Sequence, residues 1–221
     1  MTWEKDLIVL GADADVLALM RSLILKRSQD LGIRPLTAEK AEFLKDVLHD
    51  SSPPDAVASL LRGFLRTHQR ALVIRDLEGS GYEERGATEL ENAITDELSR
   101  NGWSGGRAEA IVIEPEIERW LRFDSPLFAQ AIREASRRPA AWRLDEFREK
   151  QGEMIAATGG EENQKPVRPK EVFEQILRAY RIPRSAKLYG QIAEEESVNG
   201  CTVKSFCKMV ATLQKWFPAT P

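Results

Sequence analysis

The sequence predicts an α/β protein in which a parallel sheet is covered by helices and followed by a helical extension. Apolar runs alternate with segments whose apolar residues recur at helical spacing. The runs are continuously apolar, which is typical of strands buried on both faces. Beyond residue 137 the strand signal stops. We therefore expect a sheet domain over 1–137, a helix and flexible linker over 138–168, and a helical extension over 169–221 that packs on the first domain.

The first expected unit is a strand, a tight turn and a helix. "KDLIVLG" (Lys5–Gly11) is the strand, and "ADADVLALMRSLILKRSQDLG" carries apolar residues on one helical face. Asp13 or Asp15 is placed to cap the start of this helix, and Gly32 its end. Such a unit is a typical opening of a parallel α/β sheet.

Residues 38–48 have two interpretations. Their local propensity favours a helix, whereas an α/β sheet requires a second strand near Phe43–Leu48. We favour the strand, because propensity is a weak guide. The next segment, "PPDAVASLLRGFLRTHQ", is predicted to be a helix with proline in its first turn.

The clearest strand is "RALVIRDL", which two glycines end. The helix that follows it carries Leu90, Ile94 and Leu98 on one stripe. A further strand, Glu109–Pro115, leads into a helix at "EIERWLRF". Strands that alternate with helices in this way predict a parallel sheet.

The C-terminal part is predicted to be helical after a linker. "REKQGEMIAATGGEENQKPVRP" is polar and contains glycine and proline, so we expect a mobile loop there. One helix is expected to begin at Pro169 and a second to span Ser185–Glu196. A third carries Val203 and Phe206 and ends at "KWFP".

Composition narrows the classes of function that the chain can have. A net charge of −3 argues against a protein that coats nucleic acid through a uniformly basic surface, although it leaves room for a local basic groove. The short apolar run at the N-terminus predicts neither a signal peptide nor a membrane anchor. We expect Cys201 and Cys207 to be reduced and the protein to be cytoplasmic. His49 and His68 are the only histidines, so carboxylates are expected to carry any chemistry.

Acidic residues follow three of the predicted strands. In a parallel sheet, ligands bind beyond the carboxyl ends of the strands. Residues two apart on an extended backbone point the same way, so Asp76 and Glu78 are expected to converge, as are Glu114 and Glu116. Carboxylates that meet repel one another unless a proton or a cation bridges them. The sequence therefore predicts a Mg²⁺ or Mn²⁺ site formed by Asp76, Glu78 and one of Glu114, Glu116 and Glu118.

Several of these acids also have a purely structural interpretation. Asp15 is expected to cap the first helix. Glu116 and Glu118 fall in a first helical turn, where the helix dipole favours acids. Either glutamate would also find a partner in Arg119 or Lys5.

The strand-end pair has its own structural alternative. Asp76 and Glu78 would then be solvated, or would pair with Arg75 or Arg85. Their position at the end of a buried strand is the reason to consider them as ligands. Both interpretations stay open on the sequence alone.

The order of strands and acids resembles a Toprim-type domain, the fold of topoisomerases, primases and overcoming-lysogenization-defect nucleases. That family places a glutamate at the end of its first strand and Asp-x-Asp at the end of its third. Here "RDLEG" places Asp76 and Glu78 where Asp-x-Asp would stand. "VLGADAD" places Gly11 or Ala12 where the glutamate would be, a departure from the usual strand-cleaving or strand-joining site.

A closer resemblance covers most of the chain. It is carried in order by "ALVIRDLEGSG", "GW…RAEAIVIEPEIERWL", "KPVRPKE", "RSAKLYGQIAEEES" and "CTVKSFCKMVATLQKWFP". These segments are similar to small Toprim-like proteins of bacterial antiphage islands, particularly a component of methylation-associated defence systems. The resemblance implies a role in phage defence beside a DNA methyltransferase, with other defence-system proteins as partners.

Basic residues of the C-terminal half fit a contact with DNA or another nucleic acid. Lys165, Arg168, Lys170 and Arg184 are the candidates for binding phosphate. The alternative is a solvated charged surface, because no spacing there defines an element that reads bases. The glycines of "EGSG" lack the lysine of a Walker loop, so no nucleotide cofactor is expected.

The sequence supports two hypotheses about function. A non-catalytic component would keep the fold and use its surface to assemble or regulate a defence complex, and the missing glutamate favours this hypothesis. A nuclease would instead use Asp76, Glu78 and Glu116 as catalytic residues around a metal ion that activates water for phosphodiester hydrolysis.

Overall fold

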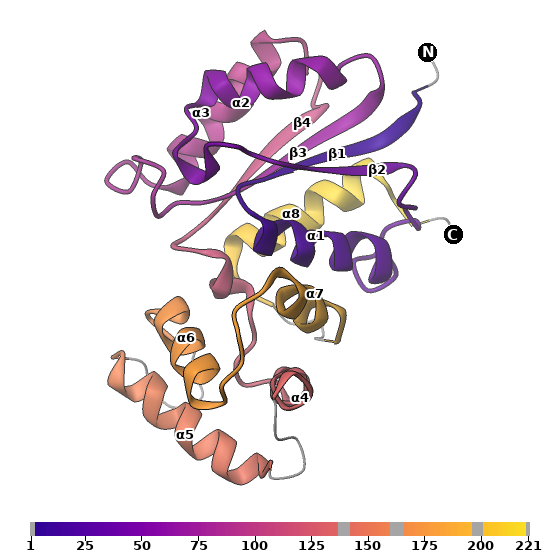
Figure 1. Cartoon of the computed structure of the whole chain (residues 1–221). Coiled ribbons are helices and arrows are strands. Elements are labelled where there is room, and N and C mark those ends of the chain that lie inside the picture. Colours follow the sequence, from indigo (N-terminus) through magenta and orange to yellow (C-terminus); the bar gives the residue numbers. More distant parts are fainter. Residues whose placement is uncertain (1–2, 137–141, 160–165, 196–200, 220–221) are drawn as a thin grey trace.

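The computed structural model describes residues 3–136, 142–159, 166–195 and 201–219. Within them the chain forms a four-stranded sheet in the order β2-β1-β3-β4, with every neighbouring pair parallel (Figure 1). The strands are β1 (Lys5–Gly11), β2 (Ala41–Lys45), β3 (His68–Asp76) and β4 (Ala108–Ile113). The predicted α/β class, a parallel sheet covered by helices, is confirmed.

Helices connect the strands and make up the C-terminal part. Those up to residue 136 are α1 (Ala14–Lys26), α2 (Pro54–Leu61), α3 (Ala87–Arg100) and α4 (Pro126–Ala135). Those that follow are α5 (Leu144–Ala157), α6 (Pro169–Ala179), α7 (Ala186–Glu195) and α8 (Lys204–Trp216). None of the helices in the described part of the chain has both the length and the apolar character needed to cross a membrane.

The sheet is buried on both faces. In β3, Leu72 and Ile74 belong to one hydrophobic cluster, and Ala71 and Val73 belong to the other. This division follows from the alternation of side chains along a strand. Asp76 ends β3 in phase with Leu72 and Ile74, so its side chain lies on their face of the sheet.

The two faces are covered by different helices (Figure 1). Helices α2 and α3 cover the Val73 face, and α1 and α8 cover the Ile74 face. Helix α7 packs on α1, and α4 packs on α7 in turn. The Ile74 face therefore lies under much of the C-terminal part.

The strand interpretation of residues 38–48 is confirmed, although β2 lies earlier than the expected Phe43–Leu48. Its position is fixed by parallel pairing with β1, in which Leu7 faces Ala41 and Gly11 faces Lys45. The sheet thus overrides the helical propensity of this segment.

The predicted loop at Arg148 was wrong over its first part, which belongs to α5. This helix buries Phe147, Gln151 and Ile155, a stripe with one residue per turn. Phe147 lies against Trp142, with 4.8 Å between the ring centroids. One apolar stripe interrupted by a glutamine does not distinguish a helix from a polar linker by periodicity. The helix is stabilised by the packing of this stripe.

Candidate functional site

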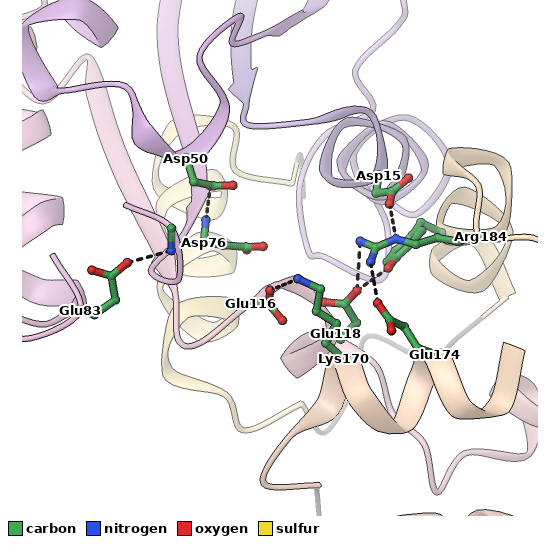
Figure 2. Close-up of polar contacts among 11 residues, drawn as sticks. Asp15, Asp50, Asp76, Glu83, Glu116, Glu118, Lys170, Glu174 and Arg184 are labelled. Carbon is green, nitrogen blue, oxygen red and sulfur yellow. Dashed lines mark hydrogen bonds and ion pairs between the residues drawn. The ribbon is translucent and has the colours of Figure 1, made fainter. Parts of the chain in front are cut away.

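The last residue of β3, Asp76, occupies the carboxyl end of the sheet's centre. It lies opposite Ile113 in the register with β4. The residue as a whole is half-buried, but its Oδ1 is closed to solvent and has no hydrogen-bond partner among the described residues. In Figure 2 its carboxylate points into the space between Asp50 and Glu116. A buried carboxylate oxygen without a partner is costly unless a proton or a cation occupies that space.

The loop after β2 supplies a second acid. Asp50 Oδ1 accepts the backbone N–H of Asp76 at 2.8 Å. The loop is held by Arg75, which is buried and donates to the carbonyls of His49 at 3.0 Å and Ser52 at 2.5 Å, and also to that of Asp50. The alternative in which Arg75 pairs with the acid beside it is therefore wrong. Arg75 points to the opposite face of β3 and positions Asp50 instead.

The segment after β4 supplies two more acids. Glu116 precedes a short 3₁₀ helix, Ile117–Trp120, and Glu118 lies within it; both side chains are buried. Glu116 forms an ion pair with Lys170 at the start of α6. The C-terminal part therefore places a cation in direct contact with the acids at the end of the sheet.

Arg184, which precedes α7, holds the second part of the site together (Figure 2). Its guanidinium pairs with Asp15 at 2.9 Å, Glu118 at 3.3 Å and Glu174 at 3.8 Å. Glu118 also accepts the hydroxyl of Tyr189. Burial and the charge of Glu118 raise the pKa of Tyr189, so this hydroxyl remains a donor. Groups of the protein itself thus contact each carboxylate near Arg184, although its single charge offsets only one of the three.

Burial shapes the titration of three acids at this end of the sheet. Burial, followed by the charges of Asp50 and Glu118, raises the pKa of Asp76 well above its ordinary value. Burial also raises the pKa of Asp50, against the opposing effect of the Asp76 backbone N–H. For Glu118, burial raises the pKa although Tyr189 and Arg184 lower it. Asp76 is the acid whose charged form the protein stabilises least.

The structure brings together only some of the predicted ligands. Asp76, Glu116 and Glu118 lie around one site, which we call the acidic site together with Asp50 and Asp15. Glu78 is exposed at its rim, near enough to Lys170 to contribute to the raised pKa of that ammonium.

The fifth predicted ligand faces elsewhere. Glu114 is exposed and lines a separate cleft. The expected convergence of residues two apart was wrong, because β3 ends at Asp76 and β4 at Ile113, before the alternation reaches the second acid of either pair. Among the described residues, no three His, Cys, Asp or Glu side chains form a group able to hold a metal ion.

Asp15 does not cap α1. The cap is Asp13, whose Oδ1 accepts the N–H of Val16 at 2.8 Å. The pairings proposed for Glu116 and Glu118 also differ from those observed: Lys5 pairs with Glu42, and Arg119 donates to the Pro166 carbonyl at 2.9 Å. The observed partners of Glu116 and Glu118 are Lys170 and Arg184, which come from the C-terminal part of the chain.

The predicted phosphate-binding residues divide into three groups. Lys170 and Arg184 are ion-paired within the acidic site. Arg168 is exposed and lies 3.3 Å from Glu171. Lys165 lies outside the described residues. Contact of these residues with nucleic acid remains a prediction.

The glycines after β3 shape a turn. Gly79 and Gly81 have φ values of 82° and 76°, which glycine adopts without strain. Their N–H groups donate to Glu83 Oε1 at 2.8 and 3.2 Å. Arg85, at the end of this loop, pairs with Glu89 and not with the strand-end acids. The loop thus leads the chain away from the acidic site toward α3.

Sequence analysis missed Asp50 and Tyr189. A signal for Asp50 was present, because the loop after β2 carries Asp46 and Asp50 just as the loops after the other strands carry acids. Tyr189 had no local signal, since only the packing of α7 on α1 brings it to Glu118.

A scan against protein-family models and searches of curated proteins and of solved structures found no match. Functional inference therefore depends on the chemistry of the site. That chemistry combines a buried acid with an unpaired oxygen, four further acids near it, and two cations from the C-terminal helical part.

Proposed function

We propose that this protein is a cytoplasmic component of a bacterial antiphage defence system, with a Toprim-like fold, that regulates or assembles a DNA-targeting complex through its acidic site. The observation that carries the proposal is the occupation of that site by Lys170 and Arg184. Carboxylates already paired with the protein's own cations are poor metal ligands for catalysis. They are well placed to couple the site to the helices that bear those cations.

The coupling has a physical basis. Lys170 begins α6 and Arg184 precedes α7, so both helices are attached to the acidic site through charge. A cation that binds beside these ion pairs repels Lys170 and Arg184, and it shifts α6 and α7 only as far as its affinity differs between the two arrangements. The surface that these helices present to a partner protein would then depend on the ligand.

The resemblance implies Mg²⁺ or Mn²⁺, and the residues fit such an ion in a restricted way. Asp76 offers an unpaired buried oxygen, and Asp50 lies beside it. A hard divalent ion often takes one or two protein carboxylates and completes its shell with water and phosphate. Glu116 and Glu118 already have cationic partners. We therefore assign the cation to Asp76 with Asp50, where it would neutralise charge and polarise bound water.

Calorimetric titration with Mn²⁺ tests the cation. Wild type and Asp96→Asn, which changes an exposed aspartate on α3, should give equal binding heats, and Asp76→Asn should give none. Hydrogen exchange then tests the coupling: Mn²⁺ should alter protection in α6 and α7 of wild type but not of Asp76→Asn. A wild type without Mn²⁺ heat, or with bound Mn²⁺ and unchanged exchange in both helices, would remove the regulatory proposal.

The defence role needs its own measurement. Cells that carry the complete defence operon should lose phage protection when this protein carries Asp76→Asn and keep it with Asp96→Asn. Equal protection by both variants would show that the acidic site plays no part in defence.

A nuclease is the second candidate function, and the unpaired Oδ1 of Asp76 is the observation that favours it. Asp76 and Glu116 would be the catalytic residues, with Glu78 at the exposed rim. Wild type with Mn²⁺ should then cleave DNA, and Asp76→Asn or Glu116→Gln should abolish cleavage while Asp96→Asn retains it. Intact single- and double-stranded DNA after incubation with wild type would eliminate this candidate.

A further inference from the structure

A second feature, a cleft, lies beside β4 at the carboxyl end of the sheet. It is a cleft of about 600 Å³ between the start of α3, the end of β4 and the start of α8. We call it the α3–α8 cleft. Its volume lies within the range of small-molecule sites, which hold ligands of drug or nucleotide size. Nothing in the proposed function uses it.

Basic side chains predominate in its lining. Among the described residues the basic ones are Arg85, Arg119, Lys204 and Lys208, and the acidic ones are Glu91 and Glu114. Both carboxylate oxygens of Glu91 already have partners: Oε1 accepts the N–H of Val112 at 3.0 Å, and Oε2 lies 3.1 Å from Lys208. Glu114, at the end of β4, is the remaining acid that an anion would meet. Arg85 and Lys208 are paired in turn, with Glu89 and with Glu91 and Glu109, so the attraction for a negatively charged ligand depends mainly on Lys204.

Lys204 is the cation most available to that ligand. It is exposed at the first position of α8, and within the described chain no ion pair or hydrogen bond engages its ammonium. Next to it, the buried Ser205 accepts the indole N–H of Trp120 at 2.9 Å. This contact leaves the Ser205 hydroxyl hydrogen free to donate. An ammonium and a hydroxyl thus lie together at the wall of the cleft.

The backbone adds to this charge. Helices α3 and α8 both begin at the cleft, and neither has a side-chain cap, since Gly86 and Val203 occupy the cap positions. The first N–H groups of a helix carry partial positive charge and bind phosphate where no side chain satisfies them. Two helix starts, an unpaired lysine and a cavity of suitable size coincide here.

We propose that the α3–α8 cleft binds a phosphate-bearing ligand of about nucleotide size. Lys204 and Arg119 would contact the phosphate from the side chains, and the first turns of α3 and α8 would contact it from the backbone. The absence of a Walker lysine argues against nucleotide hydrolysis but not against binding of this kind. The site is independent of the acidic site, because its lining includes none of the acidic-site residues.

Calorimetry with pyrophosphate in EDTA tests the site without any contribution from a divalent ion. Wild type should bind, and Lys204→Ala should weaken binding about 10- to 100-fold, the loss of one charged hydrogen bond. The control is Lys215→Ala, which removes an equal charge from the exposed far end of the same helix and should leave affinity within about twofold. A wild type that ignores millimolar pyrophosphate, or equal weakening by both variants, would overturn the proposal.

A second variant covers the case in which Lys204→Ala affects folding. Thr88→Glu places a carboxylate in the exposed first turn of α3, where it favours the helix and occupies the anion site. It should abolish pyrophosphate binding while keeping or raising the melting temperature. Retained binding would contradict the proposed location. The ligand's source follows from competition: a nucleoside monophosphate that displaces pyrophosphate points to a free nucleotide, and a single-stranded oligonucleotide lacking terminal phosphates points to a nucleic-acid backbone.

Discussion

The acidic site and the α3–α8 cleft lie at the same end of the sheet but have opposite character. In the acidic site, Glu116, Glu118 and Asp15 are paired with Lys170 and Arg184, and Asp76 keeps an unpaired buried oxygen. The cleft is open, with basic side chains and two helix starts that nothing caps. The loop over residues 77–86 begins at one and ends at the other.

The C-terminal helices reach the carboxyl end of the sheet and contribute to both sites. Helices α6 and α7 bring cations to the acids, whereas α8 lies against β4 and helps to form the cleft. The sheet supplies the strand ends, and the C-terminal part decides which charges remain available there. The predictions that follow perturb one side of this comparison at a time.

The largest effect is expected from Arg184→Ala. It leaves Glu118, whose side chain is 1% exposed, and Asp15 without their cation. Breaking a fully buried pair costs about 3–5 kcal/mol, and because the Arg184 side chain is 34% exposed we expect about 2 kcal/mol of lost stability. Urea unfolding at neutral pH measures it.

The matched control is Arg178→Ala on α6. Its side chain is 77% exposed, and its pair with Glu174 is a surface contact, so the loss should stay below about 0.5 kcal/mol. Equal losses in the two variants would mean that the Arg184 cluster is no more than a surface network.

Much of the fold could be predicted from the sequence. The strands β1, β3 and β4 are continuously apolar and buried on both faces, so their signal does not depend on distant contacts. The position of Asp76 at the end of β3 followed from that signal. By contrast, the extent of α5 was underestimated, because its buried stripe carries one residue per turn, including Gln151.

The pairing within the acidic site could not be predicted in the same way. Lys170 is 54 residues from Glu116, and Arg184 is 169 residues from Asp15. Charge alone cannot select a partner over such separations. The choice depends on how α6 and α7 pack, and packing involves many apolar contacts at once.

An intermediate effect, of opposite sign, is expected from Asp76→Asn. The folded-state pKa of Asp76 is raised, so above its unfolded value of about 3.8 the native state is penalised as the carboxyl ionises. Replacing it with the neutral amide should stabilise the protein by about 1 kcal/mol at pH 7 in EDTA.

The stabilisation by Asp76→Asn should depend on pH. The gain from Asp76→Asn should shrink as the pH falls toward 3.8, because the wild-type carboxyl is then protonated in both states. Melting curves of both proteins across this range measure it. Saturating Mn²⁺ should reverse the order at pH 7, since wild type gains stability by binding. A variant that melts below wild type in EDTA would show that the Asp76 charge is compensated.

The smallest effect on stability, and the sharpest on ligand binding, is expected from Lys170→Ala. Burial lowers the pKa of the Lys170 ammonium, but Glu116, Glu118 and Glu78 raise it by more, so the folded-state pKa lies above the ordinary value of 10.5. The ion pair therefore stabilises the fold below that value, and the stabilisation is lost as the pH rises through the folded-state pKa. The side chain is 41% exposed, so its loss should cost about 0.5 kcal/mol.

The same variant reports on competition at the acidic site. Without Lys170, the charge of Glu116 is no longer neutralised, and the electrostatic attraction for a divalent ion beside Asp76 increases. Mn²⁺ should therefore bind Lys170→Ala about 3- to 10-fold more tightly than wild type, while pyrophosphate binding at the α3–α8 cleft stays unchanged. Calorimetry with each probe separates the two sites. Weaker Mn²⁺ binding in Lys170→Ala would contradict this expectation. It would show that Lys170 helps to organise the acidic site for the ion and does not oppose its binding.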